Sequence, residues 1–175
     1  FGIGGTKKIW TLGPSDQLHP DFYVLEMKPN EVHAMWTYLT VGMSMERPDD
    51  NLIELFVYSP KQDDSLVELM TVNASFHRNA QPLYIHHTVN IGRPWLDQSI
   101  CDHGFISQPY LDGPEFEIFE FNGRTYRCFW FIPITVEERN YKTENGHEAL
   151  EQLFESGPVD FLNPKRANLI EQNKC

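Results

Sequence analysis

The chain has 175 residues, of which 41% are hydrophobic and 13% are aromatic. A sequence of this length and composition can bury one sizeable core, so disorder of the whole chain is excluded. The formal net charge of −11 at pH 7 argues against binding of nucleic acid or anionic lipid, because both need a basic protein surface. The same charge would attract a basic protein partner.

Taken in chain order, the sequence begins with residues 1–20, which are rich in Gly and Pro and predict an irregular N-terminal arm. Residues 21–175 are expected to form a single domain. Runs of apolar, aromatic and β-branched residues then predict strands within residues 22–27, 36–41, 52–60, 83–92 and 104–111. Between the third and fourth runs, helical spacing of apolar residues predicts one amphipathic helix that begins with a Ser65–Glu68 capping box and ends before Pro82.

The sequence EFEIFEFNGRTYRCFWFI, residues 115–132, contains the clearest local signal. Asn122-Gly123 separates two strand-like runs, and this dipeptide accepts the positive φ values of a type I′ turn, so a β-hairpin is predicted. The expected register pairs two sets of aromatic residues across the strands, Phe119 with Tyr126 and Phe116 with Phe129.

The hairpin's second strand is expected to stop at Pro133, which cannot donate a hydrogen bond to a sheet. Thr135 and Glu138 then fit a capping box, and Gly146 separates the helix that they begin from a second one ending at Gly157-Pro158. Near the C-terminus, Asn163 as N-cap and Pro164 at the next position predict a short last helix. Together the elements predict an α+β fold, with one central mixed sheet of five or six strands and helices packed on it.

The three cysteines, Cys101, Cys128 and Cys175, are too few and too scattered for a disulfide framework and favour a reducing compartment. Cys128 is expected to be buried and Cys175 exposed. No run of about 18 apolar residues and no signal peptide is visible, so we expect a cytoplasmic protein without a membrane span.

Motifs of known enzymes are absent from the sequence. FGIGG at the N-terminus lacks the spacing of a dinucleotide-binding loop, and neither a phosphate-binding loop nor a GxSxG elbow is present. The loop Cys101-Asp102-His103 combines residue types that a small hydrolase or a metal-binding enzyme would use. His86 and His87 are expected to point to opposite faces of one strand. We therefore predict no catalytic residue, no metal ligand and no cofactor, with an enzyme built on the Cys101 loop as the alternative.

Acidic residues suggest where a partner would bind. The alternation of acids and aromatics in EFEIFEF, residues 115–121, fits either a half-exposed strand or an acidic, aromatic contact surface. Other acids come in pairs within predicted loops, where they are solvated or form a docking patch. The candidate partner-binding residues are Asp49, Asp50, Asp63, Asp64, Asp112 and Glu115.

Four segments resemble the suppressor of fused-like (SUFU) domain family, and the resemblance runs from about residue 20 to about residue 165. They are WTYLTVGMSM, IELFVYSP, LYIHHTVNIGRPW and FWFIPITVEERNYKTENGHEALEQL. The Pro133-Ile134-Thr135 step in the last segment is the most specific. Trp36, Gly42 and Pro133 match as structural positions, and no functional residue of the family can be transferred to this chain.

The resemblance implies a compact α/β domain without catalytic activity. Animal members carry a further C-terminal domain and bind a transcription factor in Hedgehog signalling, whereas this chain is similar to the stand-alone bacterial form. Bacterial members are thought to act often as immunity proteins of polymorphic toxin systems. The expected function is therefore non-enzymatic binding of a protein, such as the neutralisation of a basic toxin domain.

Overall fold

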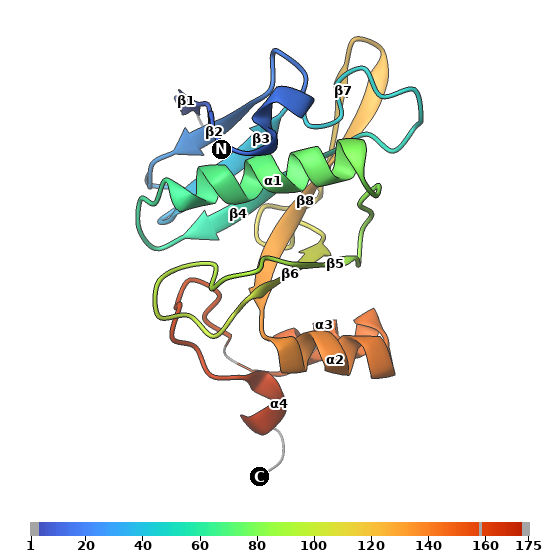
Figure 1. The fold of residues 1–175 in the computed structure, drawn as a ribbon. Coiled ribbons are helices and arrows are strands. Elements are labelled where there is room, and N and C mark those ends of the chain that lie inside the picture. Colours follow the sequence, from blue (N-terminus) through green and yellow to red (C-terminus); the bar gives the residue numbers. More distant parts are fainter. Residues whose placement is uncertain (1–3, 158, 173–175) are drawn as a thin grey trace. The chain divides into compact units, whose positions relative to one another are not determined.

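The computed structural model describes residues 4–157 and 159–172, and it divides into two compact units (Figure 1). The first unit comprises the described residues up to Ile85 together with Ile106–Phe131. The second comprises His86–Phe105 and the described residues from Ile132 onward. Strands β6 and β8 each run from one unit into the other.

The strands form one mixed sheet, which confirms the predicted α+β class. The order is β1-β2-β3-β4-β8-β6-β5, and β7 pairs with β8 beside this path. Strands β1 to β4 are antiparallel, and β4 pairs with β8 in parallel. The bounds are β1 Thr6–Lys8, β2 Tyr23–Met27, β3 Trp36–Val41, β4 Ile53–Ser59, β5 Thr88–Asn90, β6 His103–Ser107, β7 Ile118–Phe121 and β8 Arg124–Ile134.

The sheet therefore has eight strands, more than the predicted five or six. The additional strands are short. Strand β1, which pairs with β2 in the register Thr6↔Glu26, lies within the stretch that was expected to be irregular. Its sequence, TKK, has no apolar alternation, so only its partner strand could reveal it.

Of the strand predicted within residues 83–92, only the three residues of β5, Thr88–Asn90, form a strand. His86 has a φ of 65°, which is outside the range of a β-strand. The expectation that His86 and His87 point to opposite faces of one strand is therefore wrong.

Helix α1, Ser65–Asn79, packs its buried residues Leu66, Leu69 and Met70 toward the sheet, where it crosses β2, β3 and β4 (Figure 1). The predicted Ser65–Glu68 capping box does not form. Instead, the Asp63 carboxylate accepts a hydrogen bond of 3.0 Å from the Ser65 amide. A short 3-10 helix, η1 Pro14–Gln17, lies against α1.

The hairpin forms as predicted at its turn, where Asn122 and Gly123 have φ values of 51° and 71°. Phe119 pairs with Tyr126, and their rings stack with centroids 5.3 Å apart. Phe116, however, does not face Phe129. It ends the 3-10 helix η2, Pro114–Phe116, and packs edge-on against Phe56. Gly113-Pro114 turns the chain before the first predicted strand can extend.

In the second unit, α2 (Val136–Asn145) and α3 (His147–Ser156) lie side by side and meet at Gly146 (Figure 1). The Thr135–Glu138 capping box is present, as predicted. Strand β8 continues through Pro133 to Ile134, because a proline is tolerated where a strand is about to end.

The last helix, α4, is Leu169–Gln172 and starts later than predicted. Asn163 instead accepts a hydrogen bond from the Lys165 amide in a turn. Cys128 is buried, as expected, while Pro158 and Cys175 lie outside the described residues. No helix in the described part of the chain is long and apolar enough to cross a membrane.

Candidate functional site

Several apolar side chains are exposed on strand β7 and in the loop before η2, both in the first unit. They are called the exposed apolar run. Ile118, Phe119 and Phe121 are 48%, 42% and 50% exposed. Tyr110 and Leu111, a few residues earlier, are exposed as well. Single exposed apolar residues are ordinary, but several exposed large apolar side chains within one short segment are a candidate binding surface.

Beside this run lies a pocket of about 380 Å³, here called the hairpin pocket. It lies within the first unit, and β3, β4, η2, β7 and β8 all contribute to it. Its walls are mostly apolar and include Leu39, Val41, Phe116, Phe119, Phe121 and Tyr126. Its size and lining suit one large apolar side chain of a partner.

Glu54 is the buried acid of this pocket and is only 5% exposed. Its carboxyl oxygens accept hydrogen bonds from the Thr40 hydroxyl at 2.6 Å and from the backbone amides of Gly42 and Met43 at 3.0 and 3.3 Å. Burial raises the pKa of Glu54 to about 8, and these hydrogen bonds only partly oppose it. The pocket therefore has a largely uncharged floor at neutral pH.

Two exposed acids lie in the same segment as the exposed apolar side chains. Glu115 is exposed and lines the hairpin pocket, and Glu120 is exposed on β7. Asp112, by contrast, is turned inward with a side chain only 3% exposed. It is hydrogen-bonded to the Tyr58 hydroxyl and 3.6 Å from His33. Glu115 is therefore accessible at the pocket, whereas the Asp112 side chain is bound within the protein.

Asp49 and Asp50 line a second, more polar cavity of about 730 Å³ in the first unit. Arg47 is hydrogen-bonded to Asp49 and holds the pKa of that carboxyl below its usual value. Arg124 donates to the carbonyls of Arg47 and Asp49, both at 2.7 Å, and lies 3.9 Å from the fully exposed Asp50 carboxylate. Basic groups thus already offset much of the charge of this acidic pair.

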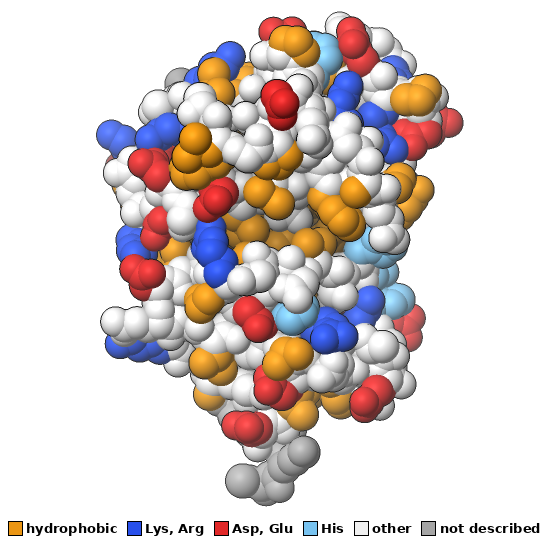
Figure 2. Space-filling model, in the orientation of Figure 1, with side chains coloured by type: hydrophobic (Ala, Val, Ile, Leu, Met, Phe, Trp, Pro, Cys, Tyr) orange, Lys and Arg blue, Asp and Glu red, His pale blue; other side chains and the backbone are white. Residues whose placement is uncertain are grey.

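Asp63 and Asp64 lie at the start of α1, where Asp63 binds the Ser65 amide and Lys61. Asp64 is exposed and 3.1 Å from Lys8. The six predicted acids therefore do not gather in one place. On the face drawn in Figure 2, acidic and basic side chains are interspersed and form no single acidic region.

The Cys101-Asp102-His103 loop has a geometry that does not favour a thiol nucleophile. Cys101 is 1% exposed, and burial raises the pKa of its thiol to about 11. A protonated thiol is a poor nucleophile and a poor metal ligand. The Nδ1 of His103 is hydrogen-bonded to an Asp102 carboxylate oxygen at 2.7 Å, not to the thiol of Cys101.

Sequence reasoning identified the acidic, aromatic segment as one of two interpretations, but it did not identify the hairpin pocket. The pocket needs residues from β3 and β4, which are distant in sequence from the hairpin. The unusual presence of Phe and Ile at exposed positions of EFEIFEF was the available signal.

Comparison with known proteins gives a consistent result. The family model described as Suppressor of fused protein (SUFU) matches residues 19–167. The crystal structure of a SUFU homolog from Neisseria gonorrhoeae is 33% identical, with a TM-score of 0.81, and the match covers 94% of this chain and 86% of that one. No match was found among curated proteins.

Two more distant structures share the fold. A Sufu–Fu complex matches with a TM-score of 0.63 and 9% identity, covering 86% of this chain and 78% of that chain. Drosophila Suppressor of Fused matches with a TM-score of 0.67 and 10% identity, and the match covers 86% of this chain but only 43% of the fly protein.

Proposed function

The chain belongs to the suppressor of fused family, and we propose that it is a non-enzymatic domain that binds a protein partner through the hairpin pocket and the exposed apolar run beside it. A distant structural relative was solved as a Sufu–Fu complex, so a protein with this fold holds a protein partner. No residue of that complex is transferred here, because the identity is only 9%.

The observation that carries the proposal is the exposure of Ile118, Phe119 and Phe121 next to an apolar pocket. Side chains with large apolar area and few rotatable bonds are the usual anchors of an interface. The acids Glu115 and Glu120 alternate with them and would form the polar rim.

We further propose that the partner is basic, for example a toxin that the chain neutralises as an immunity protein. Toxins that cut nucleic acid carry basic surfaces, because their substrate is a polyphosphate. A chain with a net charge of −11 accelerates association with such a partner by long-range attraction. Four of the predicted acids are exposed and can contribute: Asp49, Asp50, Asp64 and Glu115.

The test is a capture experiment with a matched pair of variants. The immobilised chain is exposed to lysate of the source organism at low and high salt, and the retained proteins are quantified by mass spectrometry. Phe119→Ser removes an aromatic side chain of the pocket that is 42% exposed, and Phe76→Ser removes one from α1 that is 39% exposed.

We expect one basic protein to be retained by the wild-type chain and by Phe76→Ser, to be lost with Phe119→Ser, and to be released at high salt. Retention that is equal for both variants would contradict binding at the hairpin pocket. A partner retained equally at both salt concentrations would contradict the electrostatic part of the proposal. For a retained toxin, co-expression with the chain should restore growth.

A further inference from the structure

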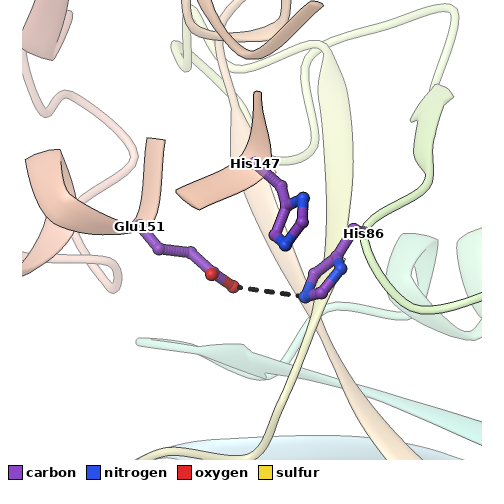
Figure 3. A group of neighbouring side chains, drawn as sticks. All are labelled: His86, His147 and Glu151. Carbon is purple, nitrogen blue, oxygen red and sulfur yellow. Dashed lines mark ion pairs between the residues drawn. The ribbon is translucent and has the colours of Figure 1, made fainter. Parts of the chain in front are cut away.

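Three side chains in the second unit bring two imidazoles and a carboxylate together: His86, His147 and Glu151 (Figure 3). One potential ligand atom from each lies within 4.8 Å of the others. The His86 Nε2 is 3.7 Å from a carboxylate oxygen of Glu151, and the rings of His86 and His147 stack with centroids 3.6 Å apart. Sequence reasoning missed this group, because residues 86 and 147 are far apart along the chain.

Two of the three residues are held by one helix. His147 is the first residue of α3 and Glu151 follows four positions later, so both side chains lie on the same face, one turn apart. A histidine and an acid at this spacing can reach one ion from a single helical face, as ligand pairs on metal-binding helices do.

The third residue comes from the segment before β5 and has an unusual backbone. His86 has a φ of 65°, a left-handed conformation that costs free energy for a residue with a Cβ. Such conformations are concentrated at positions where a side chain must be aimed for function. Here the conformation is associated with a ring that points toward α3 (Figure 3).

The surroundings suit a cation bound by neutral imidazole. The side chains of His86 and Glu151 are 29% and 16% exposed, so an ion could enter and keep water ligands. Burial, and then the neighbouring His147, lower the pKa of His86, so its charged form is disfavoured. A metal ion binds the neutral form of an imidazole. The ring of the fully buried Phe105 also lies nearly parallel to the His86 ring, with the two ring centroids 6.2 Å apart.

We propose that His86, His147 and Glu151 form a binding site for a divalent transition-metal ion, with Zn²⁺ as the best match. Two imidazole nitrogens and one carboxylate oxygen form a ligand set that Zn²⁺ accepts, and three protein ligands leave a coordination position for water. Hard cations such as Mg²⁺ and Ca²⁺ prefer sets made only of oxygen ligands.

The binding requires a small rearrangement. Tetrahedral Zn²⁺ with bonds of about 2.0–2.1 Å places its nitrogen ligands about 3.3 Å apart, and an imidazole binds a metal in its ring plane. The two rings are now nearly parallel, with 15° between their planes, so one of them must turn. His147 is half-buried at the first position of α3, so we expect its ring to be the one that turns.

The experiment is titration of the untagged, metal-free chain with Zn²⁺ by calorimetry, together with Co²⁺ absorption as a report on coordination geometry. The variants are His147→Ala and Glu151→Gln, and the matched control is His87→Ala, which removes the adjacent histidine outside the group. Circular dichroism establishes that each variant is folded. NMR of the imidazole nitrogens of the wild-type chain identifies the ligands without any substitution.

We expect one Zn²⁺ per wild-type chain, a loss of affinity of at least about tenfold in His147→Ala and Glu151→Gln, and unchanged affinity in His87→Ala. Affinity should fall as pH is lowered, because protons compete with Zn²⁺ for the imidazole nitrogens. Equal affinity of His147→Ala and the wild-type chain, or imidazole signals of His86 and His147 that do not respond to Zn²⁺, would overturn the proposal.

Discussion

Glu54 contributes both to the stability of the fold and to the lining of the hairpin pocket. Its carboxyl group ties the turn at Gly42-Met43 to strand β4 and forms the floor of the hairpin pocket. A buried carboxyl that is mostly protonated at neutral pH avoids the large cost of an unpaired buried charge. The pocket thereby stays suitable for an apolar side chain although an acid lies at its base.

This arrangement predicts a specific dependence of stability on pH. The folded chain keeps the Glu54 proton up to about pH 8, whereas an unfolded chain loses it near the usual pKa of 4.5. The folded state therefore binds more protons between these values, and the contribution of Glu54 to the free energy of unfolding decreases as pH rises through this window. Glu54→Gln has no such proton to lose, so the stability of the wild-type chain should decline relative to the variant from about pH 5 to about pH 8.

Urea denaturation followed by tryptophan fluorescence at several pH values measures this difference. Glu120→Gln, which removes an exposed carboxyl from β7, corrects for the loss of one negative charge. A difference between the wild-type chain and Glu54→Gln that stays constant over the whole window would be incompatible with the raised pKa of Glu54.

Among the elements, the start of α2 is stabilised by more than its capping box. Glu138 is fully buried and accepts hydrogen bonds from the Thr135 amide at 3.0 Å and from the Leu169 amide at 3.2 Å. Its two carboxylate oxygens also accept hydrogen bonds from the two terminal nitrogens of Arg166, at 2.7 and 2.6 Å. Arg166 donates further to the carbonyl of Pro133. One carboxylate thus joins β8, α2 and the segment that leads into α4.

Removal of the arginine should therefore destabilise the second unit strongly. Arg166→Met keeps a long apolar stem but leaves the Glu138 carboxylate buried without its cation, which typically costs about 3–5 kcal/mol. Lys165→Met, at the exposed neighbouring position, should change stability by less than about 0.5 kcal/mol. Chemical denaturation of the three chains under the same conditions makes the comparison. Similar losses for the two variants would mean that Arg166 contributes only general surface charge.

The same elements show what could be predicted from sequence. Strands β3 and β4, the Asn122-Gly123 turn and the Thr135–Glu138 box follow from signals only a few residues apart, and all were predicted. Strand β1 and the true place of Phe116 were not predicted, because each depends on a partner far away in sequence. The Arg166–Glu138 pair was missed for the same reason, since 28 residues separate its members.

At the scale of the whole molecule, net charge was an incomplete guide to function. The net charge of −11 suggested a protein whose acidic surface binds a basic partner. The six predicted acids, however, are distributed over separate loops, and several of them are paired with Arg or Lys. The exposed aromatic side chains of β7 carry more of the proposal than any acid does. We therefore expect net charge to set the association rate of a partner, and contacts at the hairpin pocket to set its dissociation rate.

Binding of a protein at the hairpin pocket can be measured by amide hydrogen exchange of the chain with and without its captured partner. We expect exchange in the complex to slow over residues 114–128, which include η2, β7 and the start of β8, and to stay unchanged over α1. Slowed exchange over α1 or over α2 and α3, with residues 114–128 unchanged, would contradict the claim.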